Sequence, residues 1–142
     1  MLNFKIEISP KLKFAPVFVA ETFASQLLLS LDVVAIKMVA YMRSQLVPGH
    51  GYDTGKLHDS LKVKLVKLAF DPGFDIVAED VDYWAYVEFG HMQRDGNWWE
   101  GYHYAAKAMQ AHMEALQGAS RVAWKTTAQI VNRSGFTLPD FR

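Results

Sequence analysis

One long helical pattern near the start of the chain constrains the fold more than any other feature. Apolar residues recur at three- and four-residue steps from Ala24 to Tyr41, and Pro16 suits the first helical turn. This spacing predicts a helix over about 17–46, which would be about 45 Å long at 1.5 Å per residue. A chain of 142 residues has limited material with which to cover both sides of so long a rod.

A second apolar stripe lies on the same predicted helix. It contains Leu29, Val33 and Ile36, whereas a surface helix normally has one apolar face of limited width. Either the helix is buried on both sides within its own fold, or the second stripe meets a neighbouring subunit. Because little chain remains to cover it, the second interpretation is favoured, and these three residues are predicted to lie at a subunit interface.

A membrane span is the alternative interpretation of this apolar segment. Asp32 and Lys37 lie inside it, and each charge near a bilayer centre is unfavourable by about 2.5–3.5 kcal/mol. The preceding stretch Met1–Ile8 lacks the basic and apolar regions of a signal peptide. We therefore expect no membrane partner, and we expect the protein to stay where it is synthesised.

Strand-like periodicity elsewhere predicts an antiparallel sheet. Leu2–Ile8 alternates apolar and polar residues, as a strand with one buried face does. Residues 60–80 show the same alternation twice and are predicted to form a β-hairpin. We expect its turn at Asp71-Pro72-Gly73, and a change of phase predicts a bulge near Leu65.

The segments after the hairpin are less uniform. The aromatic-rich stretch Tyr83–Phe89 suits either a strand or a short helix, and residues 91–101 show no period and are predicted to be a loop. Helical spacing returns over about 102–117, and it predicts a second helix that ends at Gly118. Beyond Gly118, propensity does not discriminate between helix and strand.

These elements predict a single α+β domain over residues 1–142, with both helices packed on the antiparallel sheet. Within it, residues 1–15 form an N-terminal strand or arm and residues 16–117 form the core. Residues 118–142 are predicted to be a C-terminal extension.

Composition and motif content argue against several classes of function. Fifteen basic and fifteen acidic residues give zero net charge, so the overall basic footprint of a nucleic-acid-binding protein is missing. The chain has no cysteine, and its five histidines include no pair at i, i+4. No nucleophile-elbow, phosphate-loop or dinucleotide-binding pattern is present. We expect no enzymatic activity, no metal and no cofactor.

Two short motifs combine polar residues with glycines. The first follows a proline after the long helix and reads Asp-Thr-Gly-x-Leu-x-x-Ser; the second reads Tyr-x-Ala-Tyr-Val-Glu-Phe-Gly and precedes an aromatic residue and two alanines. Asp and Thr side chains can bond backbone N–H groups, and glycine permits backbone angles closed to other residues. The main positions of the two motifs are Pro48, Asp53, Thr54, Gly55, Leu57, Ser60, Tyr83, Ala85, Glu88 and Gly90.

The acidic residue of the second motif needs a partner or exposure. Glu88 lies among aromatic neighbours, and an unpaired buried carboxylate is strongly unfavourable. If it is buried, a cation is its expected partner, either across a subunit boundary or within the same chain.

In this order, the two motifs resemble the neck and tail-completion proteins of tailed bacteriophages, which are minor virion proteins that join head to tail. The resemblance covers roughly residues 31–116. It implies a structural virion protein without a reaction or cofactor, in a homo-oligomeric ring of six or twelve. Such a ring belongs to the neck, the head–tail connector or the head-proximal end of the tail, and lines the channel through which the genome leaves.

The resemblance also implies partners and a location. The partners are head-closure or connector proteins and a tail terminator or tail tube protein, with transient contact with genomic double-stranded DNA. The location is the virion, after assembly in the host cytoplasm. Two alternatives remain open: a tail terminator ring that caps the tail tube, and a soluble binding or regulatory module encoded by a prophage.

Two further residue pairs are candidates for contacts. Trp98 and Trp99 are adjacent in the predicted loop, where they must cover apolar surface on their own or another subunit, and we predict a docking role for them. Lys62 and Lys64 alternate with apolar residues on a predicted strand, where lysines commonly prevent unwanted strand pairing. The alternative for these lysines is a positive stripe that faces DNA.

Overall fold

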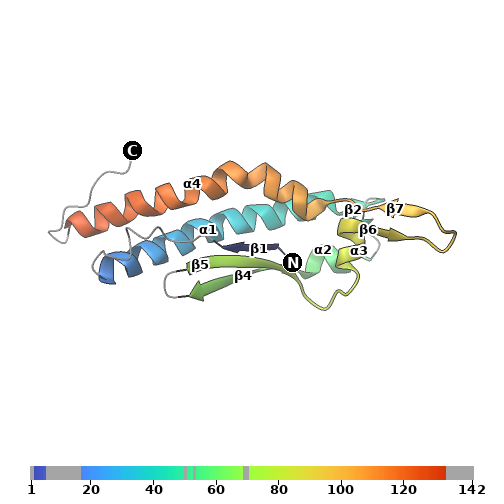
Figure 1. Ribbon diagram of the computed structural model, residues 1–142, viewed down its shortest axis with the longest axis horizontal. Helices are drawn as coiled ribbons and strands as arrows, with labels where there is room; N and C mark the ends of the chain where they lie inside the picture. The colour runs from blue at the N-terminus through green and yellow to red at the C-terminus, as the bar shows by residue number, and fades with distance from the viewer. Residues whose placement is uncertain (1, 6–16, 50, 53, 69–70, 134–142) are drawn as a thin grey trace.

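Two long antiparallel helices and a three-stranded sheet make up most of the fold, shown in the computed structural model of Figure 1. Helix α1 (Val17–Gln45) lies between the sheet and helix α4 (Tyr104–Arg133). The α+β class is therefore as predicted, but α4 packs mainly on α1, whereas both helices were predicted to pack on the sheet. The structure describes residues 2–5, 17–49, 51–52, 54–68 and 71–133.

The core forms on the side of α1 that faces the sheet and α4. Two ring contacts, Phe23 with Trp124 and Tyr41 with His112, join α1 to α4. The facing side of α4 carries small buried residues such as Ala108 and Ala123, which let the helices approach closely. The buried residues of α1 are Val19, Ala20, Phe23, Leu27, Leu31, Val34, Ala35, Met38, Val39 and Met42.

Helix α1 is also long and apolar enough to cross a membrane by length and composition alone. A helix that forms the centre of a packed core meets the same criteria. Its buried face contacts protein on two sides here, which accounts for part of its apolar composition, while Leu29, Val33 and Ile36 are exposed.

The sheet has the order β1-β5-β4, and both of its strand pairs are antiparallel. Strand β1 (Leu2–Lys5) is the described part of the predicted N-terminal strand. Strands β4 (Leu61–Leu68) and β5 (Asp71–Ala78) form the predicted hairpin. Along this hairpin Leu61, Phe74 and Ile76 face the core, while Lys62 and Lys64 are exposed on the other face.

Two details of the predicted hairpin are wrong. Strand β5 begins at Asp71, so Asp71-Pro72-Gly73 belongs to the strand and not to the turn. The register runs without a break from the Leu61–Ala78 pair to the Leu68–Asp71 pair, so no bulge occurs near Leu65. Pro72 is tolerated because it is the second residue of β5, close to the end of the strand.

Short elements gather where α1 ends and α4 begins. Strand β2 (Val47–Pro48) pairs in parallel with β3 (Gly51–Tyr52), and helix α2 (Lys56–Ser60) leads into β4. The ambiguous stretch Tyr83–Phe89 contains helix α3 (Trp84–Phe89). Aromatic residues are common in strands, but here the carbonyl of Tyr83 accepts N–H donations from the first turn of a helix.

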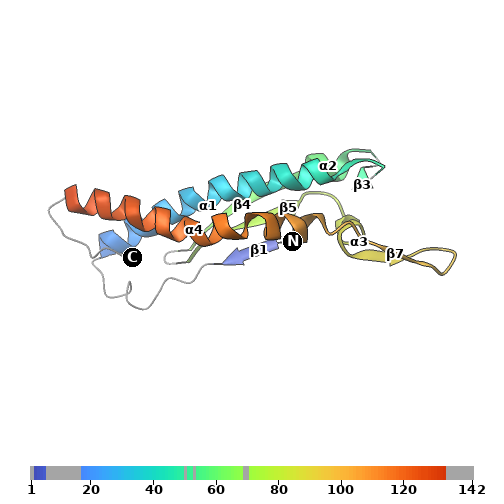
Figure 2. The ribbon, with the colours of Figure 1, turned by 90° about the horizontal axis from the view of Figure 1, so that it is seen from above.

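The predicted loop 91–101 is instead a second hairpin. Strand β6 (Gly90–Met92) pairs with β7 (Trp98–Glu100) around a turn in which Asp95 accepts hydrogen bonds from Asn97. We call this hairpin, residues 90–100, the arm. It extends past the ends of both long helices, as Figures 1 and 2 show. The strands are too short for a period to be visible in the sequence.

Helix α4 does not end at Gly118, as predicted, but continues to Arg133. Its buried face continues at four-residue steps through Ala119, Ala123, Thr127 and Val131. Packing against α1 therefore overrides the weak helix propensity of one glycine. The segment that was predicted as a C-terminal extension supplies core residues up to Val131, and residues 134–142 lie outside the described part.

Gly118 is accordingly a site where stability can be gained. An added Cβ there meets no atom within 4 Å, so Gly118→Ala is expected to stabilise the protein by about 0.5–1 kcal/mol in urea unfolding. The matched control is Ala115→Gly, at an exposed position of the same helix. This variant should lose a similar amount of unfolding free energy. A destabilised Gly118→Ala protein would mean that α4 is interrupted at Gly118 in solution.

Candidate functional site

The second motif builds the junction between α3, the arm and α4. Glu88 is only 2% exposed, and its carboxylate accepts hydrogen bonds from the backbone N–H groups of Ala105 (2.9 Å) and Ala106 (3.1 Å). These N–H groups belong to the first turn of α4. The N–H groups of a first turn have no hydrogen-bond acceptor within their own helix. The expectation that a buried Glu88 pairs with a cation is therefore wrong: the positive end of the helix dipole takes that place.

Two glycines let the chain close around this carboxylate. Gly90 has φ +88°, and a Cβ on it would overlap the backbone carbonyl of Trp99. Gly101 has an ordinary φ, but a Cβ on it would overlap the carbonyl of Glu88. The positive φ of Gly90 was predicted, whereas Gly101 was missed because its constraint comes from a segment that is distant in sequence.

The backbone ties around Glu88 fix the start of α4. Tyr102 N–H donates to the Val87 carbonyl (2.8 Å), and His103 N–H donates to the Glu88 carbonyl (3.1 Å). Tyr104 begins the helix in the core, where burial and the nearby negative charge of Glu88 raise the pKa of its hydroxyl. Tyr83 and Ala85 of the same motif are partly exposed and support α3.

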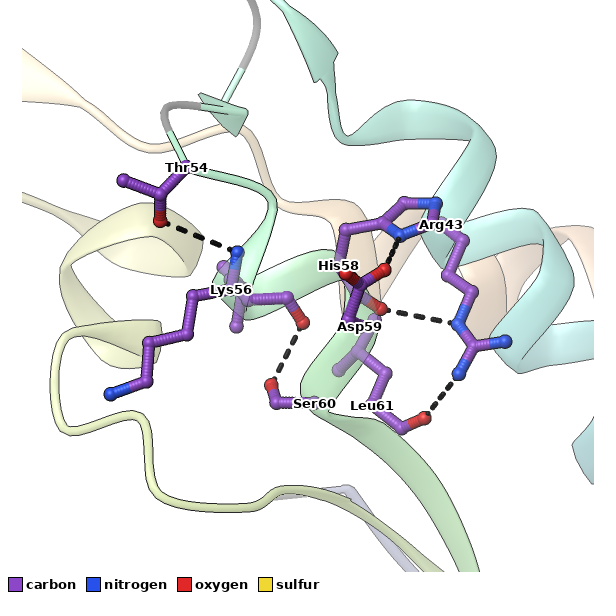
Figure 3. A network of polar contacts seen from close by, with 8 residues as sticks. Arg43, Thr54, Lys56, His58, Asp59, Ser60 and Leu61 are labelled. Atoms are coloured by element: carbon purple, nitrogen blue, oxygen red, sulfur yellow. Dashed lines mark hydrogen bonds and ion pairs between the residues drawn. The ribbon is translucent and has the colours of Figure 1, made fainter.

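The first motif forms the turn from α1 into β4. Gly55 has φ +75°, as predicted, and Thr54 Oγ1 accepts a long hydrogen bond of 3.4 Å from Lys56 N–H (Figure 3). Leu57 is buried, and Ser60 Oγ donates to the Leu57 carbonyl at 2.8 Å. Pro48 is exposed in β2, and Asp53 lies outside the described residues.

Arg43, in the last turn of α1, anchors this turn and was not predicted. Its Nε donates to the His58 carbonyl (3.1 Å) and its Nη2 to the Leu61 carbonyl (2.8 Å), as Figure 3 shows. The side chain of His58 is 2.7 Å from that of Asp59, between Nδ1 and Oδ1. A basic residue near a helix C-terminus is the only sequence signal for such a role, and it is a weak one.

The two motifs face each other across a pocket of about 1020 Å³. Aromatic rings dominate its walls, with Trp99 and Tyr102 in edge contact and His91 against Trp99. Within the described residues, no group of three or more His, Asp or Glu residues is placed to hold a metal ion. The other residues that line the pocket include Tyr83, Tyr86, Val87, Met92, Lys56, Leu57 and His58.

The predicted interface residues differ in their exposure. Leu29, Val33 and Ile36 are 61%, 54% and 56% exposed, so α1 carries an uncovered apolar stripe opposite its core face. Trp98 is 62% exposed, whereas Trp99 is partly buried against neighbouring rings of the pocket. The two tryptophans therefore have separate roles, because alternate residues of a strand point to opposite faces.

Lys62 and Lys64 are not free positive charges. Glu79 accepts from Lys62 at 2.6 Å and lies 3.1 Å from Lys64. Hydrogen bonds from both lysines lower the pKa of Glu79, and the bond that Lys62 donates to Glu79 raises the pKa of Lys62. The net charge of this group is therefore one positive unit, not two.

No family model, curated protein or solved structure matches this chain.

Proposed function

We propose that this protein is a structural virion protein of a tailed phage. In this role it forms a ring of six or twelve copies in the neck, or at the head-proximal end of the tail, around the DNA exit channel. The observation that carries the proposal is the exposed stripe of Leu29, Val33 and Ile36 on α1. Contiguous apolar surface beside a complete core is typical of contacts between proteins.

The arrangement of the motif residues supports a structural role. The carboxylate of Glu88 is occupied by two backbone N–H groups, and the hydroxyl of Ser60 by the Leu57 carbonyl. These side chains hold the chain in shape and do not present reactive groups to a substrate. The motifs that resemble neck and tail-completion proteins thus fix the angle between α1, the arm and α4.

The test replaces two stripe residues together, Val33→Asp and Ile36→Asp. Both side chains are more than half exposed, so the variant should fold as a monomer with a circular-dichroism melt close to wild type. It should not enter particles, because two buried charges per contact are strongly unfavourable. Electron microscopy of phage made with this variant measures the outcome.

The control is Leu31→Asp, which places the same charge on the fully buried face of α1 and should unfold the protein. Loss of a neck protein should give full heads and tails of normal length that are not joined. Loss of a terminator should give tails of irregular length, because nothing stops tube growth. Normal particles that contain the double variant would contradict the proposed function.

Contact with DNA in this channel is expected to be weak. With Glu79 between Lys62 and Lys64, the purified protein should show no sub-micromolar binding to a labelled duplex at physiological salt, measured by fluorescence anisotropy. Tight, salt-sensitive binding that is lost in Lys62→Glu/Lys64→Glu would contradict this expectation. Glu79→Gln is the matched variant, and it should increase affinity only if this face meets DNA.

A further inference from the structure

Among the described residues, two exposed apolar surfaces lie at different places on the fold. The α1 stripe, formed by Leu29, Val33 and Ile36, lies in the middle of the long helix. The arm patch is formed by Met92 and Trp98, which are directly opposite each other in the β6–β7 pair and are both 62% exposed. The arm extends beyond the ends of α1 and α4 (Figures 1 and 2), so the patch cannot reach the stripe of its own chain.

We propose that the two surfaces are the halves of one contact, in which the arm patch of one copy packs on the α1 stripe of the next. This inference rests on the proposed ring and specifies how it is built. A contact between two different surfaces leaves one arm free at one end of the growing assembly and one stripe free at the other. Further copies can therefore be added until a ring closes. A stripe packed on another stripe would be two-fold and would stop at a dimer.

The charges around the two surfaces match in one orientation. At 100° per residue, Asp32 and Lys37 lie on opposite edges of the stripe. On the arm, Arg94 lies near the turn, beside an Asp95 that is bonded to Asn97, and Glu100 lies at the base, 3.9 Å from His103. The apolar pair is about midway between Arg94 and Glu100. Asp32, Lys37 and Arg94 form no ion pair within the part of the chain that is described.

The dimensions fit the same orientation. The arm from its base to Arg94 spans about four strand residues, or about 13 Å, close to the 10–12 Å diameter of a helix with its side chains. An arm that crosses α1 therefore places Arg94 at the Asp32 edge and Glu100 at the Lys37 edge, with Trp98 on the stripe. Such rim charges select orientation more than they add affinity.

Complementation between variants tests the contact. Trp98→Glu removes the arm patch and Val33→Asp removes the stripe, so each variant alone should be a monomer by light scattering. An equimolar mixture should give a one-to-one dimer, because each variant keeps the half that the other has lost. The chain with both substitutions should bind neither variant, and Val122→Asp, at an exposed apolar position of α4, should assemble as wild type does.

Several outcomes would overturn the inference. They are a mixture that stays monomeric, a Trp98→Glu protein that still assembles, and a wild-type protein that stays monomeric at millimolar concentration. A two-fold dimer formed through the stripe alone would also overturn the arm-to-stripe contact. The proposed ring would then be tested by electron microscopy of phage particles. Conversely, normal joining of heads and tails by both variants would reject the ring, whatever they do in solution.

Cysteine cross-linking tests the orientation, and the absence of native cysteine gives it a clean background. Chains that carry Arg94→Cys, which lies near the arm turn on the same face as Met92, are mixed with chains that carry Asp32→Cys or Lys37→Cys. The disulfide with Asp32→Cys should form at least several-fold faster than that with Lys37→Cys. The reverse preference, or equal rates, would overturn the proposed orientation.

Discussion

Replacing Glu88 with alanine is expected to destabilise the protein by about 2–4 kcal/mol. The substitution removes both acceptors from the first turn of α4 and leaves the N–H groups of Ala105 and Ala106 without a partner. Loss of a helix cap is unfavourable by about 0.5–2 kcal/mol, and a hydrogen bond to a buried charged group contributes about 1.5–3 kcal/mol. Urea unfolding followed by circular dichroism measures the change.

Two other substitutions make this prediction specific. Glu100→Ala removes an acidic side chain that is exposed on the arm, and it should change stability by less than about 0.5 kcal/mol. Glu88→Gln keeps one acceptor oxygen but turns an amide donor toward a backbone donor. Its stability should therefore lie between those of the wild type and Glu88→Ala. If Glu88→Ala were as stable as Glu100→Ala, the carboxylate would not cap α4.

Gly90→Ala is expected to have the largest effect of any small substitution, a loss of about 3–5 kcal/mol. It combines an unfavourable φ of +88° with overlap between the new Cβ and the Trp99 carbonyl. The two causes are separable in this chain. Gly96 has φ +83° with nothing within 4 Å, so Gly96→Ala tests the backbone angle alone, at about 1–2 kcal/mol.

Gly101→Ala tests the overlap alone. A Cβ at Gly101 would overlap the Glu88 carbonyl, but the φ of Gly101 is ordinary. The variant's loss of stability should exceed that of Gly96→Ala in the same urea experiment, because the new Cβ would overlap three backbone atoms. Equal losses for Gly90→Ala and Gly96→Ala would show that the arm adjusts to the extra atom. The close backbone approach would then not be needed for the fold.

The sequence predicts those elements whose signal is periodic and local. Helix α1 and the β4–β5 hairpin were found because apolar residues repeat along them for many residues. The arm was missed because strands of three residues are too short to show a period. The end of α4 was misplaced because Gly118 is a local signal for a helix end, whereas continued burial against α1 depends on the whole fold.

The candidate site was predicted in part. The motifs identified Glu88, Gly90 and Gly55 as constrained positions, and the positive φ of both glycines is confirmed. The partner of Glu88 could not be predicted, because Ala105 and Ala106 contribute through backbone groups that any residue possesses. Gly101 and Arg43 were missed for the same reason: their contacts are with backbone carbonyls of segments distant in sequence.

The position of α1 between the sheet and α4 has a consequence for synthesis of the chain. Helix α1 is complete at Gln45, but the helix that covers it is complete only at Arg133. At about 5–20 residues per second, α1 waits several seconds for that cover. During this interval its apolar residues are accessible to chaperones, to membranes and to other nascent chains. Most contacts that α1 makes with other elements are also between residues far apart in sequence, so folding is expected to follow synthesis and to be slow for a chain so rich in helix.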